Sequence, residues 1–286
     1  MARKQFAMRT RWRLSLLGPL LVLLFSRPIY SGYKHHTLEL LLKELEHYVR
    51  AEETRQPNNG TTLPRLLSSL PLRMLEFGNQ RIHDFNLTHP YQLFDAYGFK
   101  ANLILPKEPE PEEPQSPRRW VHVPVRPFFE HLGLSYVSVD YNGADGSLPL
   151  DVRGTLRDQL REKYDIITNI GFSEHVGEFD TETNFIANQY SIFKNFHELG
   201  NAGTLYFHEV PTYFDWHLHG VAGYDVSFFE AMIQRNEYLQ GTVVVSDHHG
   251  LDKKVVVACY EQVRYKLPRL AAPTASDIPA PPPLCR

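Results

Sequence analysis

Short apolar runs rich in β-branched residues alternate along the chain with segments whose apolar positions recur at helical spacing. The alternation extends from residue 72 to about residue 240, and two strand-like runs then follow one another directly. Strands that alternate with helices favour parallel βαβ units with right-handed crossovers, and a closing pair of strands favours an antiparallel edge. The pattern therefore predicts an α/β fold with a mostly parallel sheet, an antiparallel edge strand and helices on both faces.

The expected elements follow from the two periodicities. The first helix has one apolar stripe, and Thr37 stands where a capping residue is expected. The stripe consists of Leu38, Leu41, Leu42, Leu45 and Val49. The expected helices cover residues 37–55, 90–98, 126–132, 154–163, 183–199 and 226–238, and the expected strands cover residues 72–77, 134–140, 164–168, 204–210, 242–246 and 253–260.

The two ends of the chain and one internal segment differ in composition from the rest. Residues 1–13 carry five basic residues and no acid, and a short apolar run at 14–25 follows them. This order indicates a signal peptide or signal anchor at 1–32, which predicts the secretory pathway or a membrane anchor in the endoplasmic reticulum or Golgi, with mitochondrial import as the alternative.

The remaining domain boundaries also follow from composition. We expect an N-terminal helical segment at 33–71, a domain that carries the candidate site at 72–262 and a disordered tail at 263–286. A proline- and glutamate-rich insert at 106–117 cannot bury a core, so we expect it to be an exposed, extended loop.

Composition excludes some functions. The chain has 286 residues, of which 42% are hydrophobic, an ordinary fraction for a globular core. The formal net charge of −3 gives no sign of a polyanion partner, so we expect no nucleic-acid binding. The two cysteines are too few for a disulfide framework.

Polar residues follow several of the expected strands, where ligands of α/β sheets bind. The first strand ends in MLEFGNQ, in which Gly78 would let a ligand approach the backbone or would simply turn the chain. Asp140 ends the next strand, where an acid accepts hydrogen bonds from ribose hydroxyls or begins an acidic turn. Asp151, in LPLD, would accept a bond from an adenine amino group.

The stretch YDIITNIGFSEHV, residues 164–176, combines a buried strand with a polar loop. Asn169 and Gly171 would line a cofactor cleft. Glu174 and His175 would face a substrate, and the imidazole of His175 would accept a proton near neutral pH. The alternative is that Glu174 holds His175 in a purely structural role.

Histidines follow the strand at 204–210. His208, His217 and His219 are expected on the same rim, where substrate binding is favoured over metal binding because no HExxH pattern is present. We expect no bound metal.

With these residues the chain resembles the class I S-adenosylmethionine-dependent methyltransferases, which have a Rossmann-like fold. The resemblance covers about residues 72–260 and rests on MLEFGNQ, VSVDYNG, LPLD and YDIITNIGFSEHV. It implies that S-adenosylmethionine is the cofactor. Asn79 and Gln80 stand where the family has glycines. The resemblance implies cofactor contacts from Glu76, Gly78, Asn79 and Gln80 to the methionine part, from Asp140 to the ribose and from Asp151 to the adenine. It also implies that Asn169 and Gly171 line the cofactor cleft.

The resemblance implies methyl transfer to an unknown acceptor, a small molecule or a glycan. His175 is the expected base for the acceptor, with Glu174 orienting it. Two alternatives stay open: a non-catalytic binding or scaffold protein with a degenerate fold of this kind, and a luminal glycosyltransferase, although no Asp-x-Asp motif is present. A metal hydrolase built on the histidines is a further, less favoured alternative.

Overall fold

The computed structural model describes most of the chain between residues 32 and 261. The described residues are 32–33, 35–53, 67, 70–84, 88–99, 121–177, 182–212, 220–247 and 254–261, all within a unit that spans Ser31–Arg286. The apolar run at 14–25, the insert at 106–117 and the tail at 263–286 lie outside them. In the described part of the chain, no helix has both the length and the apolar character needed to cross a membrane.

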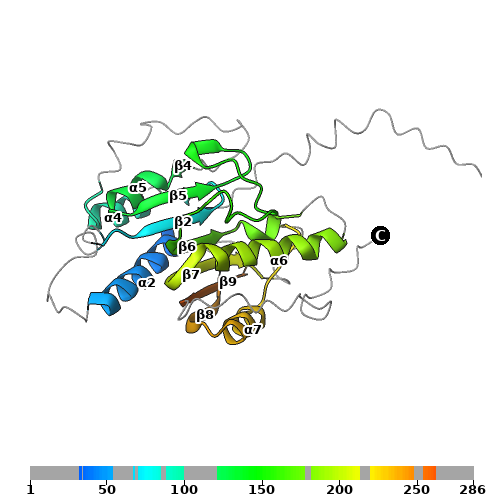
Figure 1. Cartoon of the computed structure of the whole chain (residues 1–286). Coiled ribbons are helices and arrows are strands. Elements are labelled where there is room, and N and C mark those ends of the chain that lie inside the picture. The colour runs from blue at the N-terminus through cyan, green and yellow to red at the C-terminus, as the bar shows by residue number, and fades with distance from the viewer. Residues whose placement is uncertain are drawn as a thin grey trace, which may run out of the picture. The chain divides into compact units, whose positions relative to one another are not determined.

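Six strands form the central sheet, shown in Figure 1. In spatial order they are β5 (Ser135–Val139), β2 (Arg73–Phe77), β6 (Tyr164–Ile170), β7 (Gly200–Pro211), β9 (Lys254–Glu261) and β8 (Leu239–Asp247). The first four are parallel, and β9 pairs antiparallel with both β7 and β8. The predicted mostly parallel sheet with an antiparallel edge is confirmed, and the fold is Rossmann-like α/β.

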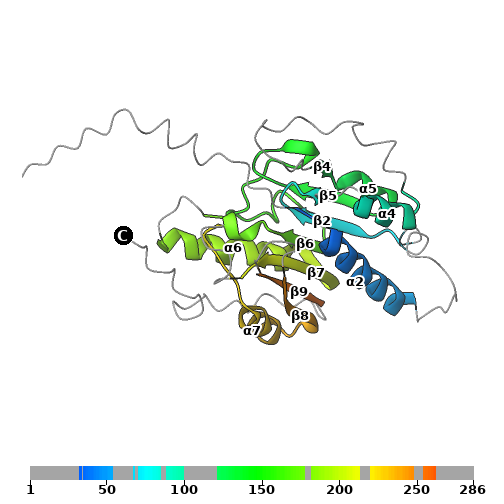
Figure 2. The ribbon, with the colours of Figure 1, turned by 180° about the vertical axis from the view of Figure 1, so that it is seen from behind.

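Helices cover both faces of this sheet, as the opposite views in Figures 1 and 2 show. The core on one face joins strand residues such as Met74 and Ile166 to α2 (His35–Glu53), α4 (Thr88–Ala96) and α5 (Arg126–His131). The core on the other face joins their strand neighbours Leu75 and Ile167 to α6 (Glu182–Leu199) and α7 (Val226–Asn236). Successive strand residues point to opposite faces, so each buried strand contributes to both cores.

The first helix has the stripe that its spacing predicts. All five stripe residues, Leu38 to Val49, are fully buried. The helix begins at His35, two residues before the expected cap, and Thr37 lies inside it and is buried. The capping role predicted for Thr37 is therefore wrong, while the apolar stripe is confirmed.

A second, three-stranded sheet was not predicted. It has the order β1 (Gly32–Tyr33), β3 (Arg81–Asp84) and β4 (Val121–Pro124), with β1 parallel and β4 antiparallel to β3. Because β3 starts directly after Gln80, the chain leaves β2 through a short loop into another strand. No helix begins at this loop.

The helix predicted over residues 154–163 is wrong, since the structure has turns there. Asn195 on α6 explains the difference. Its Oδ1 accepts the Leu156 N–H (3.0 Å), and its Nδ2 donates to the carbonyl oxygens of Val152 (2.9 Å) and Gly154 (2.8 Å). Backbone groups bonded to a side chain of another element are not available for a regular helix.

Candidate functional site

The parallel strands reverse their order of connection between β2 and β6. The chain passes from β2 outwards to β5 and then returns across β2 to β6 and β7. Ligands of open α/β sheets bind at such a switch point, beyond the carboxyl ends of the strands. Three loops begin there: Gly78–Gln80 after β2, the loop starting at Asp140 after β5, and Gly171–His175 after β6. The structure therefore brings most of the predicted site residues to one rim.

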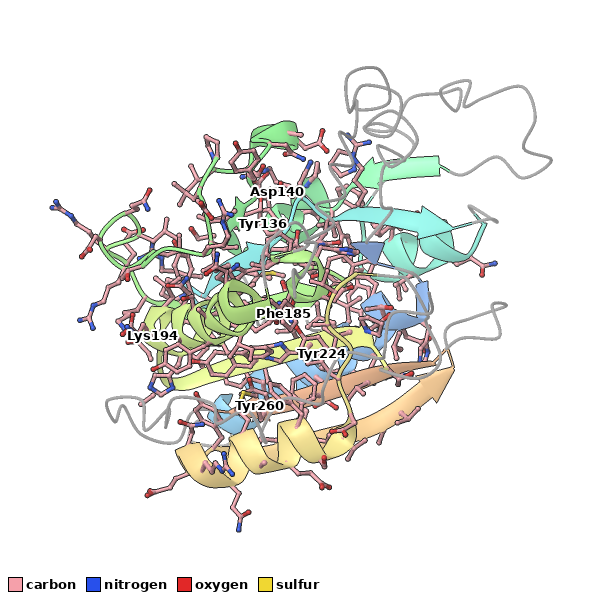
Figure 3. All side chains as sticks on the ribbon, turned by 90° about the vertical axis from the view of Figure 1, so that its right-hand side faces the viewer. Tyr136, Asp140, Phe185, Lys194, Tyr224 and Tyr260 are labelled. Atoms are coloured by element: carbon pink, nitrogen blue, oxygen red, sulfur yellow. The ribbon has the colours of Figure 1, made fainter. Side chains whose placement is uncertain are left out.

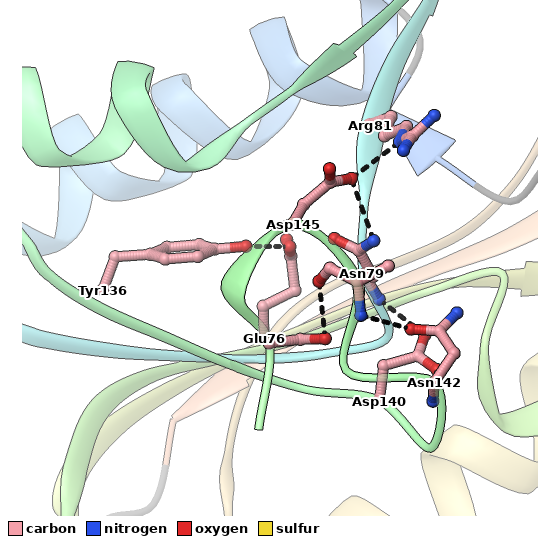
Figure 4. A network of polar contacts seen from close by, with 9 residues as sticks. Glu76, Asn79, Arg81, Tyr136, Asp140, Asn142 and Asp145 are labelled. Atoms are coloured by element: carbon pink, nitrogen blue, oxygen red, sulfur yellow. Dashed lines mark hydrogen bonds and ion pairs between the residues drawn. The ribbon is translucent and has the colours of Figure 1, made fainter. Parts of the chain in front are cut away.

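Asp140 ties two of these loops together (Figure 4). Its Oδ2 accepts the backbone N–H of Asn79 (2.8 Å), and its Oδ1 accepts that of Asn142 (3.1 Å). The Gly78 N–H donates to the carbonyl of Val139 (2.8 Å) beside them. Each carboxylate oxygen has a second acceptor direction, so Asp140 can also receive a hydroxyl from a ligand.

The side chain of Asn79 turns away from the strand ends towards the loop after β5. Its Nδ2 donates to Asp145 Oδ2 (2.9 Å), which also accepts from Arg81 Nε (2.7 Å). Partial burial acts to raise the pKa of Asp145, but the bonds from Arg81 and Asn79 outweigh it and the pKa is lowered. Asn79 and Arg81 are thus held in place on either side of Gln80.

Glu76 lies wholly inside the protein, below the loop that was expected to carry it to a cofactor. Its carboxyl accepts a hydrogen bond from the hydroxyl of Tyr136 (Figure 4). It also accepts one from the hydroxyl of Thr168, at 3.5 Å, and one from the Gln80 N–H. Burial raises its pKa to about 7, and these bonds act in the opposite direction. With no exposed surface, Glu76 supports the Gly78 loop from beneath.

Gly78 is covered by two side chains. Its φ is +94°, and a Cβ on this residue would lie 2.4 Å from Gln80 Nε2 and 2.9 Å from Phe172 Cδ2. Gln80 is 1% exposed; its Nε2 donates to the carbonyl of Phe77 (3.3 Å), and its Oε1 has no hydrogen-bond partner. The carboxamide of Gln80 thus occupies the space that a second glycine would leave open.

Asp151 is exposed on the segment that follows β5. Arg153 binds both of its carboxylate oxygens, with Nη2 2.8 Å from Oδ2 and Nε 2.9 Å from Oδ1. The hydrogen bonds from Arg153 lower the pKa of Asp151. Its predicted contact with an adenine stays a prediction.

Asn169 is buried and organises the loop that follows β6. Its Oδ1 accepts the Ser173 N–H (3.0 Å), while its Nδ2 lies 2.9 Å from Ser173 Oγ and 3.1 Å from His208 Nδ1. Gly171 has φ +56° and donates its N–H to the carbonyl of Glu209 on β7 (2.8 Å). Asn169 and Gly171 therefore shape the loop through internal contacts.

His208 is enclosed on all sides. Because the amide of Asn169 donates to Nδ1, the ring proton is on Nε2, which lies 2.8 Å from the hydroxyl of Tyr260. Burial lowers the pKa of His208 to about 3, so the ring is neutral. Both ring nitrogens are engaged, and a direct contact with a substrate would require this arrangement to open.

The hydrogen bonds around Asn169 and Ser173 extend through Tyr224 to Gln189 on α6. Tyr224 OH lies 2.9 Å from Ser173 Oγ and 2.7 Å from Gln189 Oε1, and Gln189 Nε2 donates to the carbonyls of Ser173 (2.8 Å) and Val176 (2.9 Å). In the view of Figure 3, Tyr224 lies on the opposite side of α6 from Asp140. Gln189 thereby fixes the short 3-10 turn Ser173–His175 to the helix.

Glu174 and His175 lie together in that turn. Glu174 is fully buried, and burial raises its pKa to about 8, with the charge of Glu209 adding to the effect. Its Oε1 is 3.7 Å from His175 Nε2, and the His175 side chain is 17% exposed. The raised pKa favours the protonated form of Glu174, whereas the sequence was interpreted with a carboxylate beside His175.

The two remaining predicted residues, His217 and His219, lie outside the described residues. In the described part of the chain, no group of three or more metal-binding side chains is close enough to hold an ion.

Sequence reasoning missed the tyrosines of the site. Tyr136, Tyr224 and Tyr260 supply hydroxyls to Glu76, Ser173 and His208, and each comes from a different part of the chain. A tyrosine in an apolar segment has the pattern of a core residue, so nothing local indicates its polar partner.

No family model and no curated protein matches the chain. Several solved structures are similar to it, among them these two. One, "Structure of the citrinin polyketide synthase CMeT domain", is 11% identical with a TM-score of 0.34 over 79% of this chain and 53% of that one. The other, "PigF with SAH", is 14% identical with a TM-score of 0.30 over 85% of this chain and 69% of that one. The chain thus spans about half the length of the first structure, and neither likeness assigns a family.

Proposed function

We propose that this chain binds S-adenosylmethionine at the switch point and transfers its methyl group to an acceptor at the rim of β6. The observation that supports this most directly is the placement of Asp140. Its carboxylate stands at the end of β5, beside the turn at Gly78, and retains acceptor capacity for the hydroxyls of a ribose. This fits a nucleoside ligand that carries no phosphate, since the loop after β2 leads directly into the strand β3 and not into a helix whose N-terminus could bind a phosphate.

When bound, S-adenosylmethionine supplies a methyl group on a sulfonium, which an aligned nucleophile can take. The residues of this chain would bind and orient. Asp140 would hold the nucleoside, and His175 would accept a proton from the acceptor. In the turn Ser173–His175, the His175 side chain keeps some exposed surface while Ser173 and Glu174 are fully buried. Both ring nitrogens of His175 are buried, so the ring has to turn outward before it can accept a proton from the acceptor.

Gln189 would act as a positioning residue, because it holds the turn that carries His175.

Calorimetric titration of the full-length protein with S-adenosylmethionine and S-adenosylhomocysteine tests this proposal. We expect both to bind, and we expect Asp140→Asn to weaken binding about tenfold or more, since a bond to a charged acceptor is lost. Asp158→Asn, at an exposed acid outside the loops of the switch point, is the control and should bind as the wild type does.

Unchanged affinity in Asp140→Asn would show that the nucleoside is bound elsewhere. Absence of binding in every variant would remove the methyltransferase proposal and leave a non-catalytic binding protein.

A further inference from the structure

The switch point contains one side chain that both the fold and the sequence leave unexplained. Gln80 follows the turn at Gly78, and its amide nitrogen lies 2.4 Å from the ideal position of a Cβ on Gly78, which is too close for a Cβ to fit there. Phe172 covers the same glycine from the β6 side, with its ring 6.2 Å from that of Phe77. Two loops therefore close over the backbone of Gly78.

Any extended ligand held by Asp140 has to pass this point. The strand order β5-β2-β6 places Gly78 between Asp140 and the loop at Gly171–His175. A nucleoside whose ribose lies at Asp140 can reach the β6 loop with its 5′ substituent only by crossing Gly78. The carboxamide of Gln80 lies across this route.

The hold on the Gln80 side chain is weak. Its Nε2 makes one bond at the long distance of 3.3 Å, and its Oε1 is buried without a hydrogen-bond partner. A buried acceptor that is left unpaired destabilises a protein, and rotation of the side chain into solvent would satisfy it. Rotation of the Gln80 side chain away from Gly78 therefore requires little free energy.

The backbone around Gln80 is held firmly. Its own N–H donates to Glu76, the Asn79 N–H donates to Asp140, and Arg81 is bound to Asp145 and begins β3. Opening the route over Gly78 therefore requires rotation of the Gln80 side chain and not movement of the loop.

We propose that Gln80 is a specificity-determining residue: its carboxamide fills the space over Gly78 and must rotate away before a nucleoside's 5′ substituent can cross to the β6 rim. This inference rests on the proposed function. It implies that the wild-type protein discriminates by size at the 5′ position, accepting adenosine without displacement of Gln80 and S-adenosylhomocysteine only with it.

The test is calorimetric titration of the full-length wild type, Gln80→Ala and Gln80→Met with adenosine and with S-adenosylhomocysteine. Gln80→Ala should bind S-adenosylhomocysteine about three- to tenfold more tightly, because no side chain has to be moved from over Gly78, and should bind adenosine unchanged. Gln80→Met keeps the volume of the side chain and should resemble the wild type. Gln159→Ala, at an exposed glutamine, is the matched control.

The outcomes separate the two proposals. Equal or weaker binding of S-adenosylhomocysteine to Gln80→Ala would overturn the inference and leave the proposed function intact. A parallel gain for adenosine would also overturn it, because the effect would then not be local to Gly78. No binding of either ligand to any variant would remove the proposed function itself.

Discussion

The hydroxyl of Tyr136 on β5 donates a hydrogen bond to the buried carboxyl of Glu76 on β2. This pair joins two neighbouring parallel strands directly beneath the Gly78 loop, and Thr168 on β6 reaches the same carboxyl. Glu76 thus connects the three strands that flank the switch point. An acid at this position is costly to bury, and its partners reduce that cost without removing it.

Replacement of Glu76 by glutamine should flatten the dependence of stability on pH. The pKa of Glu76 is raised from 4.5 to about 7 in the folded protein. Its stabilising contribution is therefore complete below pH 4.5 and is lost as the pH rises through 7, a change of about 3 kcal/mol. Urea unfolding of the wild type and Glu76→Gln between pH 4 and 8 measures it.

Glu174 remains in both of these proteins, so the difference between their curves isolates Glu76. Glu230→Gln, at an exposed position on α7, should reproduce the wild-type curve. Parallel curves for the wild type and Glu76→Gln would show that Glu76 does not titrate in this range.

Gln189→Leu should loosen the turn that carries His175. The substitution removes the bonds that Gln189 makes to the carbonyls of Ser173 and Val176 and to the hydroxyl of Tyr224. Loss of these buried bonds should lower the free energy of unfolding by about 2 kcal/mol. Hydrogen exchange should also become faster over residues 172–176, whereas Gln234→Leu, exposed on α7, should change neither measurement. Protection of this turn equal to that of the wild type would rule out the positioning role.

Gly220→Ala should destabilise the protein because the residue lies against the turn at Glu174. Its φ is +76°, and a Cβ would lie 2.7 Å from the Glu174 backbone oxygen. We expect a loss of about 2–3 kcal/mol in thermal or urea unfolding. Gly154→Ala is the matched control, since Gly154 lacks a positive φ and its nearest neighbouring atom is 3.6 Å away. Equal stability of the two variants would contradict the close contact.

Local patterns were sufficient for most of the architecture. The stripe from Leu38 to Val49 is buried as predicted, and so are Ile166, Ile167 and Thr168 in the strand predicted at 164–168, because hydrophobic periodicity is a property of neighbouring positions. The three-stranded sheet was missed since Tyr33 pairs with Ile82 across 49 residues and each strand is short. The helix at 154–163 was wrongly predicted for a similar reason. Asn195, which is distant in the sequence, forms hydrogen bonds with backbone groups of this segment.

For the candidate site, the sequence by itself determined which polar residues follow the strands, and so which rim they share. Only the tertiary structure decided what each of them faces. It turned Glu76 and His208 inward, paired Asp140 with the N–H of Asn79, and placed the amide of Gln80 over Gly78. The physical reason is that strand position follows from the pattern along the chain, whereas burial, protonation and hydrogen-bond partners depend on side chains that only folding brings together.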